Sequence, residues 1–183
     1  MEGRPRTEHA HEESWETTLR ILAVTQFSAH HCCKAAARHM IAGGRGGSII
    51  VVGSIMAEFN HPTSSAYTSS KCAIKKLGEV MARELAPHGV RVNVVQPGHM
   101  YTANEQAGMA GWTQAARDAY LPRIPVGRMG TGEDIGHAVV FLCSSSASYI
   151  TGATLSVDGG YTTALDLQAD GGPAELRRSS AAQ

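Results

Sequence analysis

The sequence has 183 residues, of which 43% are hydrophobic, and this length and composition predict one globular domain with a real core. Sixteen basic and sixteen acidic residues cancel, so the charge gives no basis for binding nucleic acid or an acidic membrane surface. No apolar run approaches the roughly 20 residues that a membrane-spanning helix needs. We therefore expect neither a nucleic-acid partner nor a membrane partner.

The N-terminal segment is polar and lacks the apolar core of an export signal. The four cysteines include two neighbours and no C-x-x-C pair, which does not suit a secreted disulfide scaffold. We expect reduced thiols and a cytoplasmic location. These cysteines are Cys32, Cys33, Cys72 and Cys143.

Three apolar runs predict β-strands. SIIVVGS (48–54) is rich in β-branched residues and shows no polar alternation, which is typical of a strand buried on both faces of a parallel sheet. VRVNVVQPG (90–98) predicts a second strand, which ends at a proline. ATLSVDGG (153–160) predicts a third strand that ends in glycines.

Helical patterns fill the stretches between and before these strands. Residues 15–40 predict an irregular helix, 64–86 the clearest helix and 103–121 a mixed polar, helical excursion. Thr131 and Asp134 resemble a capping box at the start of another helix. The apolar stripe of the clearest helix is expected at Ala66, Ala73, Leu77, Val80, Met81 and Leu85.

The alternation of strands and helices predicts an α/β fold with a parallel sheet. We place the domain at residues 15–161, after a flexible N-terminal arm at 1–14 and before a disordered tail at 162–183.

Tyr67 and Lys71 are the candidate reactive pair, because residues four apart share one face of a helix. A free tyrosine titrates near 10, and a nearby ammonium lowers that pKa by up to about three units at an effective dielectric near 20. Such a phenol suits general acid–base chemistry at neutral pH. Ser54, at the end of the preceding strand, can hold the reacting oxygen. A Y-x-x-x-K pair alone is common by chance, so its interpretation depends on the rest of the sequence.

Four other features have a structural interpretation that we prefer to a functional one. The HHCC run at 30–33 cannot converge on a metal, because successive helical residues point about 100° apart. His99 is either a substrate contact or a solvent-facing loop residue, and we expect the second. We expect Cys72 to be a buried small residue and Asp158 a turn or interface residue.

The motifs together resemble the C-terminal part of a short-chain dehydrogenase/reductase. The spacing of Ser54, Tyr67 and Lys71 matches the family's active-site serine and its Y-x-x-x-K motif. RVNVVQPGHMYT (91–102) resembles the family's RVN-x-x-x-PG strand, and GATLSVDGG (152–160) resembles its last strand. The resemblance implies a Rossmann-like, doubly wound parallel sheet that is truncated to its C-terminal half.

The same resemblance implies hydride transfer between NAD or NADP and a small carbonyl or alcohol substrate. In this reading Tyr67 passes a proton to or from the substrate oxygen, Ser54 hydrogen-bonds that oxygen, and Lys71 tunes the tyrosine and holds the nicotinamide ribose. The resemblance also implies a homo-oligomer, assembled through the helices near 20–40 and 64–86. Its remaining cofactor contacts would be Pro97, Gly98, Met100 and Thr102.

The sequence departs from the family in two ways. None of its twenty glycines forms the G-x-G-x-x-G turn that holds a pyrophosphate, so we expect the free energy of cofactor binding to be weaker by about 5–9 kcal/mol. Because the sheet would keep only the last three strands of the family, we also expect a bare edge on the strand at 48–54. Thr25 stands where the family has an asparagine, and Ser28 where it has a glycine. The alternative function is a non-catalytic remnant that at most associates with a full-length relative.

Overall fold

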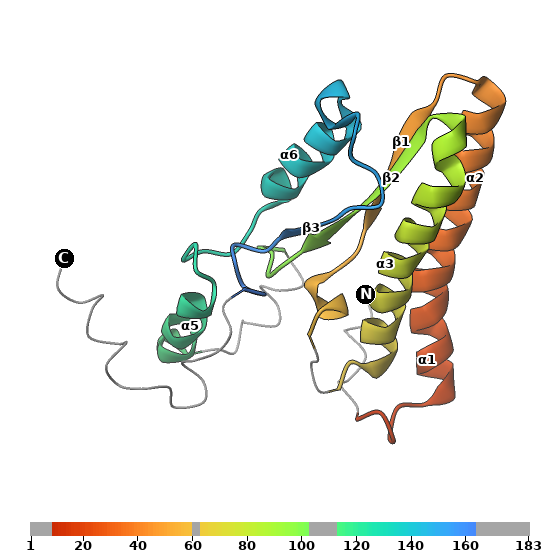
Figure 1. Cartoon of the computed structure of the whole chain (residues 1–183). Coiled ribbons are helices and arrows are strands. Elements are labelled where there is room, and N and C mark those ends of the chain that lie inside the picture. The colour runs from red at the N-terminus through yellow and green to blue at the C-terminus, as the bar shows by residue number, and fades with distance from the viewer. Residues whose placement is uncertain (1–8, 60–62, 103–112, 164–183) are drawn as a thin grey trace.

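Three parallel strands form the sheet of this protein (Figure 1). The computed structural model describes residues 9–59, 63–102 and 113–163. Both neighbouring pairs of strands are parallel, in the order β1-β2-β3. The strands are β1 (Gly47–Val52), β2 (Val90–Pro97) and β3 (Thr154–Val157). The three predicted strands and the parallel sheet are therefore confirmed.

The central strand β2 is buried on both faces. Val92, Val94 and Val95 are each at most 1% exposed. Because side chains alternate along a strand, Val92 and Val94 pack into one core cluster while Val95 packs into a second. Two polar residues of β2, Asn93 and Gln96, are fully buried as well, and hydrogen bonds satisfy both: the Asn93 amide nitrogen donates to the Ile150 carbonyl oxygen at 3.0 Å, and that of Gln96 donates to the Glu58 carboxylate at 3.1 Å.

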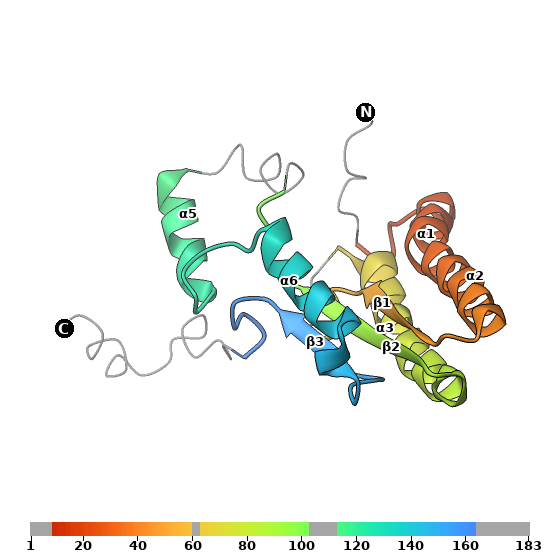
Figure 2. The same cartoon turned by 90° about the horizontal axis from the view of Figure 1, so that it is seen from above.

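Helices cover both faces of the sheet, which makes the fold doubly wound (Figures 1 and 2). α2 (Ser28–Gly43) and α3 (Ser65–Leu85) pack on one face, against Ile49 and Val51 of β1. α6 (Gly132–Cys143) packs on the other face, where Leu142 meets Val95. The Asp134 carboxylate accepts from the Thr131 backbone N–H at 2.7 Å, which confirms the predicted capping box.

The predicted irregular helix is one long helix with a π-helical segment inside it. α1 (Trp15–Leu22) continues into the π segment Ala23–Phe27 and then into α2. The sequence did not predict this segment, which contains Thr25. A π turn widens the helix by one residue, and such segments are frequent at functional sites.

The buried face of α3 differs in part from the predicted stripe. Ile74 is 2% exposed although the stripe left it out, whereas Val80 is 47% exposed although the stripe included it. The small residues Ser70 and Gly78 are also buried, because the helix lies close against β2 there. Burial on this face follows the shape of the sheet more than residue hydrophobicity.

The remaining helices are short. The predicted helical excursion is confirmed only at α5 (Gln114–Tyr120), and residues 103–112 lie outside the described part of the chain. The predicted tail also lies almost wholly outside it, and the domain boundaries stay predictions. Single 3₁₀ turns occur at Ile55–Ala57, Ala86–His88, Leu121–Arg123 and Ser145–Ala147.

In the part of the chain that the structure describes, β1 pairs with β2 alone, so its outer edge carries no other strand there, as predicted. Val52 at the end of β1 is 51% exposed. Figure 2 shows this edge beside the long helix α1–α2. In the same described ranges, no helix is both long and apolar enough to cross a membrane.

Candidate active site

Ser54 lies at the carboxyl end of β1, where the strand turns into a 3₁₀ helix. Its backbone is extended and its side chain caps that helix, with Oγ accepting from the Met56 backbone N–H at 3.2 Å. The residue is 9% exposed. Because Oγ already accepts one hydrogen bond, the hydroxyl proton is available to donate to a further group.

Tyr67 and Lys71 lie one turn apart near the start of α3. The Lys71 Nζ atom is 5.5 Å from the centre of the Tyr67 ring, and it donates to the Val52 carbonyl oxygen at 3.1 Å. Burial lowers the pKa of the Lys71 ammonium, because the charged form loses water. Val52 precedes Ser54 by two residues, so Lys71 is fixed to the strand that carries Ser54.

A groove of about 370 Å³ contains the tyrosine and the lysine. It lies between the long helix, the bare edge of β1 and α3. Thr25 and Ser28, which we expect at the family's asparagine and glycine positions, both line it, whereas Ser54 does not. Its other described lining includes Val24, Cys32, Ile50, Val52 and Ile74.

The exit of β2 lies at the same end of the sheet. Gly98 donates its N–H to the Val157 carbonyl oxygen at 3.1 Å, and a Cβ on Gly98 would come within 2.6 Å of the Asp158 Cα atom. Glycine is therefore required for this approach. Met100 forms a bridge with Gly130, which fixes the backbone that follows Pro97.

Parallel strands bring these two exits together. Val52 pairs with Val95, and the Gly53 N–H donates to the Val95 carbonyl oxygen at 2.8 Å. Ser54 and Pro97 each stand two residues beyond that pair, so they leave the sheet at the same level. Side chains and ligands collect at this carboxyl end in open α/β sheets.

His99 is not the solvent-facing residue that we expected. It is half-buried between two tyrosine rings, whose centres lie 5.1 Å (Tyr120) and 4.6 Å (Tyr161) from its own. Its Nδ1 atom is 2.5 Å from the Tyr120 hydroxyl. The three residues come from different segments, so the sequence alone gave no sign of this packing.

The cysteines and the HHCC run form no metal site in the described residues. Cys33 is buried in the core while His30, His31 and Cys32 are exposed, so the HHCC run does not converge. Across the described ranges no three His, Cys, Asp or Glu side chains gather in a way that could hold a metal. Cys72 is exposed, so its predicted burial was wrong; its Sγ atom lies 3.6 Å from the Ala57 carbonyl oxygen.

Asp158 is a turn residue, as we expected. Its carboxylate accepts from the backbone N–H groups of Gly160 and Thr162, each at 2.9 Å. Sequence reasoning missed a second polar group near the strand exits, made of Glu58, Lys75 and Gln96. Only the spacing of Lys75, one turn after Lys71, could have drawn attention to it.

Known proteins match this chain over most of its length. The profile of a family described as enoyl-(acyl carrier protein) reductase matches residues 3–162. This chain belongs to the short-chain dehydrogenase/reductase family. The predicted resemblance is thereby confirmed, together with the Rossmann-like fold.

Individual family members are identical to this chain at about one residue in three of the matched stretch. 2-Dehydro-3-deoxy-D-gluconate 5-dehydrogenase of Escherichia coli is 36% identical over 150 residues, which are 82% of this chain and 57% of that enzyme. (3R)-3-hydroxyacyl-CoA dehydrogenase of Mus musculus is 36% identical over 152 residues, 83% of this chain and 56% of that enzyme. The chain thus spans somewhat more than half the length of these relatives.

Solved structures agree with the fold. A putative 2-deoxy-D-gluconate 3-dehydrogenase from Agrobacterium tumefaciens, solved with bound NADP, superposes with a TM-score of 0.81 at 33% identity. That match covers 89% of this chain and 65% of that one. Acetoin dehydrogenase from Enterobacter cloacae gives a TM-score of 0.76 at 33% identity, over 90% and 63% of the two chains.

Proposed function

We propose that this chain takes part in hydride transfer between a nicotinamide cofactor, NAD or NADP, and a small carbonyl or alcohol substrate. The observation that carries this proposal is the position of the Lys71 ammonium. It lies beside the Tyr67 ring and donates to the Val52 carbonyl oxygen, two residues before Ser54. A member of the short-chain dehydrogenase/reductase family with this arrangement has the groups that a carbonyl reduction requires.

Tyr67 is the proton donor in the direction of reduction. A partly buried ammonium disfavours its own charge, and a phenolate beside it offsets part of that cost. The pair therefore favours the state in which Tyr67 has given its proton to the substrate oxygen.

Ser54 holds the substrate oxygen. Its Oγ accepts from the Met56 N–H, which leaves the hydroxyl proton available to donate to the substrate oxygen. One donor to a developing oxyanion is worth roughly 10²–10³ in rate. Ser54 and Tyr67 would then approach the same oxygen from the strand end and from the helix.

The nicotinamide cofactor supplies or accepts the hydride when it is bound. Tyr67 and Lys71 would hold its ribose, while the β2 exit would hold its carboxamide through Pro97, Gly98, Met100 and Thr102. The close approach at Gly98 and the Met100–Gly130 bridge fit this role, because they fix a stretch of backbone at the strand end. Two solved relatives are described with bound NADP, which supports the choice of cofactor class.

The names of the relatives support an alcohol or ketone as the reacting group. They include dehydrogenases of a sugar acid, of 3-hydroxyacyl-CoA and of L-rhamnose. These substrates share a secondary alcohol or hemiacetal carbon and little else. We therefore propose the reaction class and leave the substrate to be found by assay.

One observation favours the second candidate, a chain that associates with a relative and does not turn over alone. The edge of β1 is bare and apolar, with Val52 51% exposed, and such an edge is a template for another strand. The 370 Å³ groove opens along the same edge. Under this candidate a partner strand fills the edge before any cofactor binds.

A titration separates the two candidates. NADH or NADPH is added to the purified chain while nicotinamide fluorescence and the thermal unfolding midpoint are recorded. A response below about 1 mM supports the first candidate, an enzyme, and turnover is then assayed with a panel of carbonyl compounds and alcohols. No response at about 5 mM, the range set by an affinity loss of 5–9 kcal/mol, rejects independent catalysis by this chain.

Self-association and location complete the proposal. The long helix exposes Trp15 (72%) and Phe27 (47%), and α3 exposes Val80 (47%). These apolar surfaces support a homo-oligomer through the two helices, which sedimentation equilibrium of the purified chain would test. All four cysteines are unpaired, which supports the reducing cytoplasm as the compartment.

A further inference from the structure

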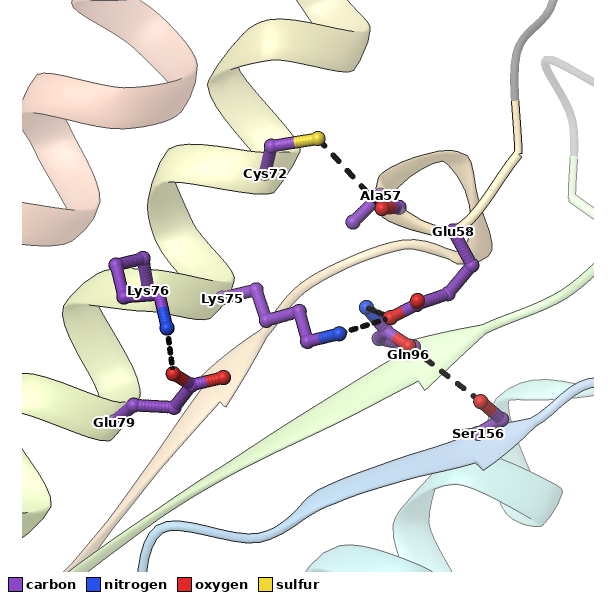
Figure 3. Close-up of polar contacts among 8 residues, drawn as sticks. All are labelled: Ala57, Glu58, Cys72, Lys75, Lys76, Glu79, Gln96 and Ser156. Carbon is purple, nitrogen blue, oxygen red and sulfur yellow. Dashed lines mark hydrogen bonds and ion pairs between the residues drawn. The ribbon is translucent and has the colours of Figure 1, made fainter.

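Four polar side chains from four different segments meet beside the strand exits (Figure 3). The Lys75 Nζ atom on α3 is 2.6 Å from the Glu58 Oε1 atom, and the Gln96 Nε2 atom on β2 donates to the same oxygen at 3.1 Å. At its other end the Gln96 Oε1 atom accepts from the Ser156 hydroxyl of β3 at 3.4 Å. We call Glu58, Lys75, Gln96 and Ser156 the exit network.

Gln96 is the buried centre of the exit network. Its side chain is fully buried, and a buried amide must find partners for both its oxygen and its nitrogen. Glu58 can only accept when it is ionised, so it turns the amide nitrogen toward itself and the amide oxygen toward Ser156. The carboxylate of Glu58 therefore decides the orientation of Gln96.

The exit network connects the proposed catalytic segments. Glu58 follows the 3₁₀ turn that Ser54 caps, with its own N–H donating to the Ile55 carbonyl oxygen at 2.8 Å. Lys75 stands one turn after Lys71 on α3, and Gln96 immediately precedes Pro97. One carboxylate oxygen thus joins the end of β1, the helix of Tyr67 and Lys71, and the exit of β2.

We propose that Glu58 is a positioning residue, which holds the Ser54 turn in register with α3 and with the Pro97 exit. This inference rests on the proposed function, because it assumes that Ser54 and the β2 exit act on one substrate and cofactor. Glu58 itself touches no reacting atom in this proposal. It acts by restricting where Ser54 Oγ can lie.

The arrangement explains why a charged residue stands at this place. The Glu58 and Lys75 side chains are 35% and 31% exposed, so their attraction is only partly screened. Misplacing a catalytic group by about 1 Å can reduce turnover by roughly 10²-fold. Loss of Glu58 frees the turn after Ser54 and leaves the Gln96 amide nitrogen buried without its acceptor.

Two substitutions at Glu58 separate positioning from charge. Glu58→Ala removes the shared acceptor, whereas Glu58→Gln keeps a carbonyl oxygen that Lys75 and Gln96 can both donate to. Lys75→Met keeps the bond between Glu58 and Gln96 and removes the bond between Glu58 and α3. The matched control is Glu79→Ala, since Glu79 pairs with Lys76 on the same helix (Figure 3) and acts on Lys75 through its charge alone.

The test combines amide hydrogen exchange of residues 54–59 with turnover and cofactor response. We expect Glu58→Ala to speed the exchange of the backbone amides at positions 56, 57 and 58 by about tenfold or more. The unfolding midpoint of this variant should fall by at most about 5 °C. Where the wild type turns over, kcat falls about 10²-fold and KM changes less than about threefold. Glu58→Gln restores both readouts to within about threefold, Lys75→Met gives an intermediate exchange rate, and Glu79→Ala changes neither.

The outcomes also separate this inference from the proposed function. A wild type without cofactor response or turnover rejects the proposed function, and the exchange data still decide whether Glu58 holds the turn. Exchange of residues 54–59 that is equal in Glu58→Ala and wild type overturns the positioning role. So does a Glu79→Ala variant that behaves like Glu58→Ala, and so does a Glu58→Gln variant that restores neither readout. If Glu58→Ala does not fold, Lys75→Met carries the same comparison.

Discussion

The Lys71 ammonium lies 5.5 Å from the centre of the Tyr67 ring and is held there by the Val52 carbonyl oxygen, at 3.1 Å. The helix alone places the two residues on one face. The strand decides the rest, because the Val52 carbonyl points from the bare edge of β1 toward the helix and keeps the long lysine side chain from reaching into solvent.

Replacement of Tyr67 by phenylalanine tests the proton donor. We expect Tyr67→Phe to reduce any turnover by at least 10²–10⁴-fold, because the ring remains and only the acidic hydroxyl is lost. The unfolding midpoint should stay within about 2 °C, since the residue is 37% exposed. Tyr149→Phe, at a fully exposed tyrosine, is the control and should leave turnover unchanged. Retained turnover in Tyr67→Phe rules Tyr67 out as the donor.

Gly78 is required by the packing of α3 on β2. A Cβ on Gly78 would overlap the Val94 Cγ2 atom, and Val94 is buried and cannot move aside. We expect Gly78→Ala to destabilise the protein by about 1–3 kcal/mol, even though alanine favours helix. Gly136→Ala in α6 is the matched control, because its Cβ would meet nothing within 4 Å.

Urea unfolding of both glycine variants measures this difference. The control should gain up to about 1 kcal/mol from helix propensity alone. A Gly78→Ala variant as stable as Gly136→Ala would mean that α3 can shift away from the sheet without cost.

Leu142 anchors α6 on its face of the sheet. It is 2% exposed and packs with Val95 and Ala147, so Leu142→Ala should destabilise the protein by about 2–5 kcal/mol through lost burial and a cavity. Val140→Ala, on the same helix at 68% exposure, should change the free energy of unfolding by less than about 0.5 kcal/mol. Equal effects in thermal unfolding would contradict the packing of α6 described above.

The Glu58–Lys75 pair predicts how stability changes with pH. The hydrogen bond from Lys75 lowers the pKa of Glu58 below its ordinary 4.5, and the bond to Glu58 raises the pKa of Lys75 above its ordinary 10.5. The stabilisation by Glu58 is therefore complete above pH 4.5 and is lost as the pH falls through the folded pKa. That by Lys75 is complete below pH 10.5 and is lost as the pH rises further.

A comparison of wild type with Glu58→Gln checks this sign. The difference in free energy of unfolding should be at most about 1 kcal/mol at pH 7, because the pair is partly exposed, and should shrink as the pH falls below 4.5. A difference that grows on acidification would show that Glu58 is not stabilised in its charged form.

The sequence by itself determined the elements and the family. Runs of β-branched residues require burial on both sides, so the strands at 48–54 and 90–98 could be predicted without a structure. The i, i+4 spacing of Tyr67 and Lys71 and the capping pair Thr131 and Asp134 are local, and local geometry follows from sequence.

Only the tertiary structure decided which distant side chains meet. Glu58 and Gln96 are 38 positions apart, and His99 and Tyr161 come from the exits of different strands, so neither pair leaves a periodic signal. The burial of Ile74 and the exposure of Val80 and Cys72 were likewise set by where the sheet lies against α3. Hydrophobicity and spacing act along one element, whereas a buried amide or a shared carboxylate oxygen depends on how several elements pack in three dimensions.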